Sequence, residues 1–218
     1  FFNQPVEIHG SGRTDAGVHA LGQVANFKID TTLVSKNTPL NATDIKYSLL
    51  QYFPEDIRIL SLEEVDNRFH ARLNAKEKTY RYTICLSQAA PVFNRKYCML
   101  LPDKINIELM KSASKKLLGT HDLLGFSDTK TKKSTVRTVN FIDITEDDGI
   151  IRIRINGTGF LYNMVRIIAG TLMDVGRGKY PPRMVERILE KKDRCAAGPT
   201  APANGLMLKE LRFLELER

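Results

Sequence analysis

The clearest hydrophobic pattern in this chain is a strict alternation of apolar and polar residues over positions 78–86. Tyr80, Tyr82 and two aliphatic residues fall on one face, and Arg81 falls on the other face with threonines and a cysteine. A period of two predicts a β-strand with one buried face. The tyrosines fit either a core or, beside nearby lysines and arginines, a surface on which an RNA base stacks.

Further strands are predicted at positions 24–29, 57–65, 136–145, 150–156 and 205–213, and apolar and polar residues alternate at 24–29 and 150–156. The sequence Glu-Asp-Asp-Gly before position 150 predicts a hairpin turn. In the strand after this turn, isoleucines alternate with Arg152 and Arg154. We therefore expect that strand to have one buried face and one basic face.

Apolar residues at helical spacing predict four helices, over positions 43–53, 106–118, 160–174 and 182–191. Thr43 is expected to cap the first helix, while Gly119 and Gly176 are expected to end the second and third. Arg166 lies in the middle of the otherwise apolar third helix. Because a half-buried arginine is costly without a carboxylate beside it, this pattern predicts such a partner.

The length of the chain, 218 residues, suits one large domain or two small ones. Strand and helix blocks alternate similarly in both halves, and the loop-rich segment 89–102 lies between them. We therefore expect an N-terminal subdomain over 1–90, which carries the glycine-rich loop described below, and a C-terminal subdomain over 91–218.

The excess of basic residues points to an anionic partner. Lysine and arginine total 33 against 25 aspartates and glutamates, which gives a net charge of +8 spread along the chain. Nucleic acid is the first candidate for such a surface, with an anionic membrane or no partner as alternatives. No apolar run is long enough to span a bilayer, so we expect no membrane-embedded segment.

Cysteine and histidine usage points to a reduced, metal-free protein. The three cysteines are far apart and odd in number, which is typical of free thiols in a cytoplasmic protein. The four histidines and the cysteines lack the spacing of a zinc site, so we expect no metal.

The segment 10–20 combines three glycines with Arg13, Thr14 and Asp15. Glycines leave room for close approach of another chain and allow backbone angles that other residues avoid. The segment fits either a tight connection, in which Asp15 and Arg13 cap local backbone groups, or a site that receives another molecule's backbone. It matches neither the P-loop nor the dinucleotide-binding glycine pattern.

Four separated stretches resemble motifs of the TruA family of tRNA pseudouridine synthases. They are Gly-Arg-Thr-Asp-Ala-Gly-Val-His-Ala at 12–20, Lys-Thr-Tyr-Arg-Tyr at 78–82, Gly-Phe-Leu-Tyr-Asn-Met-Val-Arg at 159–166 and Ala-Asn-Gly-Leu at 203–206. The segments 119–122 and 136–138 also match, in the family's order. The resemblance runs from about Val6 to Phe213, which is nearly the whole chain.

This resemblance implies that uridine is isomerised to pseudouridine in the anticodon stem-loop of tRNA, without a metal or an organic cofactor. It implies an α+β fold of two similar subdomains, whose mainly antiparallel sheets are flanked by helices and meet at a basic cleft. A homodimer in the cytoplasm is implied as well. Family members begin with a further strand and helix, with a Tyr-Asp-Gly type motif, before the region that matches Val6. The resemblance therefore implies an N-terminal subdomain without that strand and with an exposed sheet edge.

The resemblance also assigns roles to individual residues. Asp15 would be the catalytic aspartate, Arg166 would pair with it, and Tyr80 would stack on the target base. Substrate-binding residues would include Arg13, which would hold the flipped nucleotide or its phosphate, and also Leu206, Lys78, Arg81 and His19. An aspartate beside an arginine is held ionised at neutral pH. That form suits attack on the ribose carbon or on the base, or stabilisation of charge as the glycosidic bond breaks, better than general-acid catalysis.

Two other functions compete with this hypothesis. A basic module that binds tRNA without modifying it would share the charge and would be indifferent to replacement of Asp15. A phosphoester hydrolase that uses Asp15 is a weaker alternative, because a metal-dependent version needs a carboxylate or histidine cluster that the sequence does not suggest.

Overall fold

The computed structural model describes residues 2, 4–30, 41–86, 92–102, 104–130 and 133–213. The chain divides into two compact units. Unit 1 comprises Phe1–Gly12 and Val24–Asn74, and unit 2 comprises Arg13–Gln23 and Ala75–Arg218. The division therefore differs from the boundary expected at residue 90, and the segment 13–23 joins the C-terminal unit.

Strand β4 (Ala75–Cys85) explains this division. It confirms the strand predicted over 78–86, and it pairs antiparallel with β8 (Ile150–Gly157) on one side and β9 (Leu206–Phe213) on the other. Since both neighbours come from the C-terminal half, the backbone hydrogen bonds of β4 tie it to that half.

Unit 1 contains a short antiparallel pair and one helix among its described residues. Strand β1 (Ile8–Gly10) pairs with β3 (Ala25–Phe27), and helix α2 covers Ala42–Leu50. The helix is capped by Asn41, whose side-chain oxygen accepts a 2.9 Å hydrogen bond from the Asp44 amide. The expectation that Thr43 forms the cap is therefore wrong, because Thr43 already lies inside the first turn.

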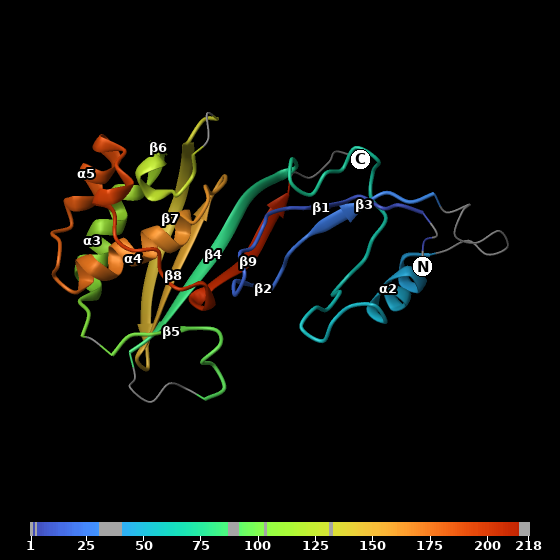
Figure 1. Ribbon diagram of the computed structural model, residues 1–218, viewed down its shortest axis with the longest axis horizontal. Coiled ribbons are helices and arrows are strands. Elements are labelled where there is room, and N and C mark those ends of the chain that lie inside the picture. The colour runs from blue at the N-terminus through green and yellow to red at the C-terminus, as the bar shows by residue number, and fades with distance from the viewer. Residues whose placement is uncertain are drawn as a thin grey trace. The chain divides into compact units, whose positions relative to one another are not determined.

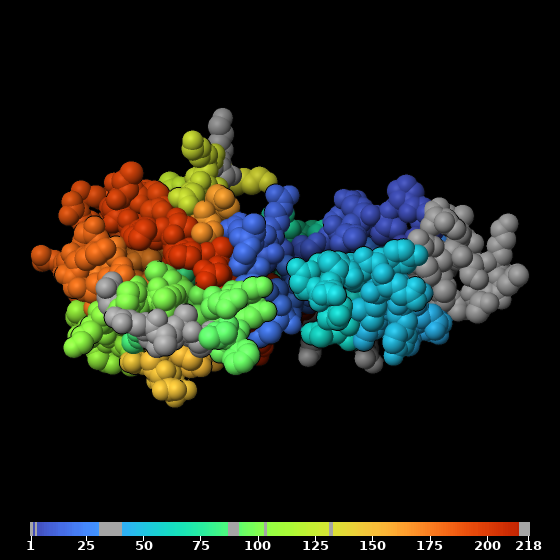
Figure 2. Space-filling model, turned by 60° about the horizontal axis from the view of Figure 1, so that its bottom comes forward, coloured from blue at the N-terminus to red at the C-terminus, as the bar shows by residue number. Residues whose placement is uncertain are grey.

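The strand predicted over 57–65 does not form. The structure assigns this segment no strand, and it gives it no strand partner within the described chain. Leu60 is 74% exposed, and Tyr52, just after α2, is 70% exposed. Figure 2 shows α2 and the residues after it, in cyan, at the surface of unit 1. The strand prediction for 57–65 is therefore wrong, since the described residues offer this segment no sheet to join.

Unit 2 is built on one sheet of seven strands in the described part of the chain. The order is β2 (His19–Ala20), β9, β4, β8, β7 (Val136–Asp147) and β6 (Gly119–Asp122), with β5 (Met99–Leu100) beside β4. Only the β2–β9 and β4–β5 pairs are parallel among these strands. The predicted hairpin joins β7 to β8, and its turn places Asp148 and Gly149 at positive φ.

Three helices cover one face of this sheet, as Figure 1 shows. They are α3 (Ile107–Ser114), α4 (Met164–Gly176) and α5 (Met184–Lys191). Unit 2 also contains the 3₁₀ turns Lys115–Leu117, Leu124–Phe126, Arg194–Ala196 and Ala203–Gly205. The core between sheet and helices contains Tyr82 and, from β8, Ile151, Ile153 and Ile155. Arg152 and Arg154 lie on the opposite face, as predicted. No helix of the described residues has the length and apolarity needed to cross a membrane.

Helix α4 begins four residues later than predicted, because Asn163 adopts a left-handed conformation with φ of +59°. Gly176 does not end the helix through a positive φ. It allows close packing, since a Cβ there would lie 2.5 Å from Ile105 and 2.8 Å from Met110 side-chain carbons. The left-handed residue after the helix is Gly178, with φ of +75°.

Asp122 at the end of β6 gives unit 2 a pH-dependent contribution to stability. Hydrogen bonds from Lys192, at 2.8 Å, and from Thr135 hold the pKa of Asp122 below its ordinary value of 3.8. The ionised Asp122 carboxylate therefore stabilises the fold above pH 3.8, and this stabilisation is lost as the pH falls through the lowered pKa.

Replacing Asp122 by asparagine should therefore lower the unfolding free energy at pH 7 by about 1 kcal/mol or less. In acid well below pH 3.8 the two proteins should become equally stable. Urea unfolding at both pH values measures this difference. If the asparagine variant had an equally lowered unfolding free energy at both pH values, the carboxylate charge would contribute nothing to stability.

Candidate active site

The glycine-rich segment 10–20 forms a tight turn that presents Asp15. The Val18 amide donates a 3.0 Å hydrogen bond to the Asp15 carbonyl, which closes a four-residue turn. Gly17, at the third position, has φ of +83°, a conformation that favours glycine. The strand β2 that follows is fixed against β9, so the turn holds Asp15 in place within unit 2.

Asp15 forms an ion pair with Arg166 of helix α4. Arg166 Nη1 donates to Asp15 Oδ2 at 3.2 Å. The arginine side chain is 17% exposed and the aspartate side chain 36% exposed. The carboxylate that the apolar surroundings of Arg166 require is therefore Asp15, and it keeps access to solvent.

Two further acceptors fix the Arg166 guanidinium. Its Nε donates to the Ala201 carbonyl at 2.7 Å, and Nη1 also donates to Asn163 Oδ1 at 3.0 Å. The Ala201 carbonyl can come so close because glycines lie where the segment 198–201 crosses α4: a Cβ on Gly170 would overlap the Pro199 carbonyl. Backbone, side chain and carboxylate thus hold the guanidinium in one orientation.

Asn163 connects Arg166 to a second charged pair. Its amide nitrogen donates to Asp128 Oδ2 at 2.8 Å, and Arg194 Nε donates to Asp128 Oδ1 at 2.8 Å. Arg194 also donates to Thr200 Oγ1 at 2.9 Å. Burial alone would raise the pKa of Asp128, but hydrogen bonds from Asn163 and Arg194 outweigh it and hold the pKa below its ordinary value. The sequence analysis assigned no role to Asn163, Asp128 or Arg194.

Tyr80 lies on the core face of β4, and the Asp15 carboxylate acts on its phenol electrostatically. Its ring is buried and contacts Phe160 edge-on, with ring centroids 5.0 Å apart. Burial raises the pKa of Tyr80, and the Asp15 carboxylate raises it further, so the phenol stays protonated at neutral pH. Tyr80 can therefore offer this site an apolar ring edge and an uncharged hydroxyl.

Leu206 begins β9 directly opposite Tyr82 of β4 and is buried. Gly205 before it lets the backbone approach the Tyr82 ring, since a Cβ there would lie 2.6 Å from Cζ. Tyr82 donates its hydroxyl proton to the Pro202 carbonyl at 2.9 Å. The motif at 203–206 is thus fixed to the same strand that carries Tyr80.

The other expected site residues separate into two groups. Arg13 is exposed two residues before Asp15, and Lys78 shares the face of β4 that carries Tyr80. Arg81 points to the opposite face of β4. His19 pairs in register with Met207, which also lies on that opposite face, and its ring contacts Tyr97 and the Lys96 carbonyl. The structure therefore does not bring Arg81 or His19 together with Asp15.

This arrangement can place one negative charge beside a bound nucleoside. Among the described residues, Oδ2 of Asp15 carries the Arg166 bond and Oδ1 accepts no hydrogen bond. An oxygen in this state can attack an electron-poor carbon or stabilise a developing positive charge.

Comparison with known proteins gives the family. A family model described as tRNA pseudouridine synthase matches residues 113–214. A protein of Bacillus cereus named tRNA pseudouridine synthase A 2 is 46% identical over 209 residues, which cover 95% of this chain and 82% of the relative. The protein of the same name from Clostridium tetani is 45% identical over 211 residues, 96% of this chain and 82% of the relative. The tRNA pseudouridine synthase A of Bacillus licheniformis is 45% identical over 206 residues, 93% of this chain and 80% of the relative. With such identity over nearly its whole length, the chain belongs to the TruA family of tRNA pseudouridine synthases.

Proposed function

We propose that this chain isomerises uridine to pseudouridine in the anticodon stem-loop of tRNA, with Asp15 as the catalytic carboxylate. The observation that carries the proposal is the 3.2 Å pair between Asp15 and Arg166 in a chain of this family. The relatives are named for tRNA and for pseudouridine, and those names supply the substrate class.

The reaction needs bond rearrangement without net oxidation or hydrolysis. The bond between N1 of uracil and C1′ of the ribose breaks, and a bond between C5 and C1′ forms. The hydrogen on C5 leaves as a proton, and N1 gains a proton, so atoms and electrons balance within the nucleoside and water. A carboxylate is sufficient for such a sequence, acting either at C1′ or on the base.

The positions of the side chains support the proposed roles. Asp15 acts on the nucleoside through its carboxylate, and Arg166 orients that carboxylate. Tyr80 and Leu206 contact the flipped base, whose extrusion costs a few kcal/mol. Arg13 and Lys78 lie on the loop and on the strand face that could meet its phosphates.

The finer features implied by the family belong to the same proposal. They are two subdomains that meet at a basic cleft, a homodimer, and a cytoplasmic location. The net charge of +8 supports a basic RNA-binding surface.

A binding module that holds tRNA without modifying it is the second candidate, and the basic charge favours it equally. An unmodified anticodon-arm transcript, incubated with the chain and mapped by carbodiimide treatment, separates the two. Our proposal predicts pseudouridine in the anticodon arm. Salt-dependent binding of the same transcript, with no pseudouridine formed at saturating protein, would favour the binding module.

A further inference from the structure

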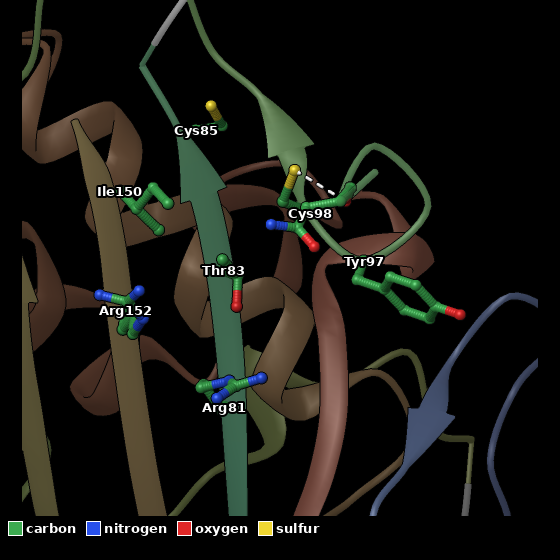
Figure 3. A pocket seen from close by; sticks show the side chains of 8 residues that line it. Arg81, Thr83, Cys85, Tyr97, Cys98, Ile150 and Arg152 are labelled. Atoms are coloured by element: carbon green, nitrogen blue, oxygen red, sulfur yellow. Dashed lines mark hydrogen bonds between the residues drawn. The ribbon is translucent and has the colours of Figure 1, made fainter. Parts of the chain in front are cut away.

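A second group of side chains lines a pocket on the face of the unit 2 sheet that is opposite to Tyr80. The pocket has a volume of about 160 Å³ and is lined by Arg81 and Thr83 of β4 and by Arg152 of β8. Figure 3 shows these side chains on one face of the two strands. Tyr97 and Cys98, from the segment before β5, line the same pocket from beside β4. The roles proposed for Asp15, Arg166 and Tyr80 leave this pocket without a function.

Arg81 brings a positive charge to the pocket that no carboxylate balances in the described part of the chain. Its Nε is buried and lacks a hydrogen-bond acceptor there. Its Nη2 donates to the sulfur of Met207 at 3.3 Å, and a thioether is a weak acceptor. Because a partly buried guanidinium is costly without acceptors, this arrangement calls for an anion.

The neighbours of Arg81 add positive charge. Arg154 lies directly opposite Arg81 in the strand register, and Arg152 lies opposite Thr83. The charge of Arg154 is balanced by Asp143, whose Oδ2 lies 2.6 Å from Arg154 Nη2. Arg152 is paired less closely, since its Nη1 lies 3.7 Å from Oδ2 of the exposed Asp147. Burial raises the pKa of the Cys98 thiol, so that group brings no negative charge at neutral pH.

We propose that this pocket binds a phosphate group of the tRNA backbone, held by Arg81 and Arg152 with the Thr83 hydroxyl. Guanidinium groups match phosphate oxygens with paired hydrogen bonds, which favours phosphate as the ligand. The inference rests on the proposed function only in naming tRNA as the source of the phosphate. Since Arg81 and Tyr80 point to opposite faces of β4, the phosphate belongs to a different part of the RNA from the target nucleotide.

Binding of an unmodified tRNA transcript to the chain and to its Arg81→Gln variant tests the inference. The variant should bind about tenfold more weakly at low salt. Its plot of log affinity against log salt should be shallower by about 0.7 to 0.9, the slope of one phosphate contact. Arg152→Gln should give a smaller loss in the same direction, and it carries the test if thermal unfolding shows that Arg81→Gln does not fold.

Arg187→Gln is the matched control, because Arg187 is exposed on helix α5 and its loss changes the net charge equally. An equal loss of affinity in this variant would overturn the inference, since it would show a general effect of charge. Unchanged affinity and slope in folded Arg81→Gln would overturn it as well. Binding is measured apart from pseudouridine formation, so failure of this inference and failure of the proposed function give different results.

A comparison with inorganic phosphate shows whether the pocket binds a phosphate of the tRNA backbone or free phosphate. Potassium phosphate is compared with potassium chloride at equal ionic strength, and the melting temperature of each protein is measured. Stabilisation of the parent chain alone, together with weaker tRNA binding by Arg81→Gln, would support the inference. Stabilisation of the parent chain with equal tRNA binding by both proteins would assign the pocket to free phosphate and overturn the RNA assignment.

Discussion

Replacing Asp15 by asparagine should abolish pseudouridine formation while tRNA binding stays within about twofold to threefold of the parent chain. The amide keeps the shape of the carboxylate but is neither a nucleophile nor a charge, so the step that breaks the glycosidic bond loses its catalyst. We expect a loss of about a thousandfold or more in the single-turnover rate constant, or more than about 4 kcal/mol in the activation barrier. The rate constant at saturating unmodified tRNA measures this loss.

The matched control is Asp66→Asn. Asp66 also pairs with an arginine, at 3.1 Å from Arg68, but it lies in unit 1 outside the proposed site. This variant should react at the parental rate. Pseudouridine formation by Asp15→Asn near the parental rate would refute the catalytic role of Asp15.

The second large effect is expected at Arg166. Lysine keeps the positive charge but cannot reach Asp15, Asn163 and the Ala201 carbonyl together, because its ammonium lacks the planar fork of arginine. Arg166→Lys should slow the single-turnover reaction by about tenfold to a hundredfold, the cost of one charge-assisted hydrogen bond. Since the carboxylate is still present, the loss should be smaller than for Asp15→Asn.

The variant pair Asn163→Ala and Arg166→Lys tests whether orientation is the cause. If Asn163 acts by holding the guanidinium, its removal should slow the parent chain but have little further effect on Arg166→Lys. Independent, additive losses would contradict a shared positioning role. Thermal unfolding of each variant separates slower chemistry from loss of fold.

Strand β4 and the β7–β8 hairpin could be predicted because local pattern and tertiary burial agree there. Tyr82 and Ile84 are fully buried, as the alternation requires, and the hairpin turn carries the glycine that its positive φ favours. The segment 57–65 was also predicted as a strand, but it has no strand partner among the described residues. Alternation indicates which face of a strand would be buried, but it contains no information on whether a neighbouring strand exists.

The start of helix α4 could not be predicted from hydrophobic spacing, for a different reason. Phe160 and Leu161 fit the apolar stripe of the helix, so hydrophobic spacing extends it too far. The positive φ of Asn163 is incompatible with a helix, so the helix can start only after this residue. Hydropathy does not encode that backbone angle.

The candidate site was predictable only in part. Burial of Arg166 required a carboxylate, but Asp15 lies 151 positions away and was indicated by resemblance to a family. Asn163, Asp128 and Arg194 were missed because each is an ordinary polar residue of a loop or turn. The Ala201 carbonyl could not be predicted at all, because a backbone acceptor has no residue type.

Release of hydrogen from C5 of uridine tests the central claim most directly. Formation of the C5–C1′ bond must expel that hydrogen, so tRNA transcribed with uridine tritiated at C5 should lose tritium to water when the chain is added. The account predicts one tritium released for each pseudouridine formed, with the RNA chain intact, and none with Asp15→Asn. Saturating binding of this tRNA without tritium release would contradict the claim that the chain is a pseudouridine synthase.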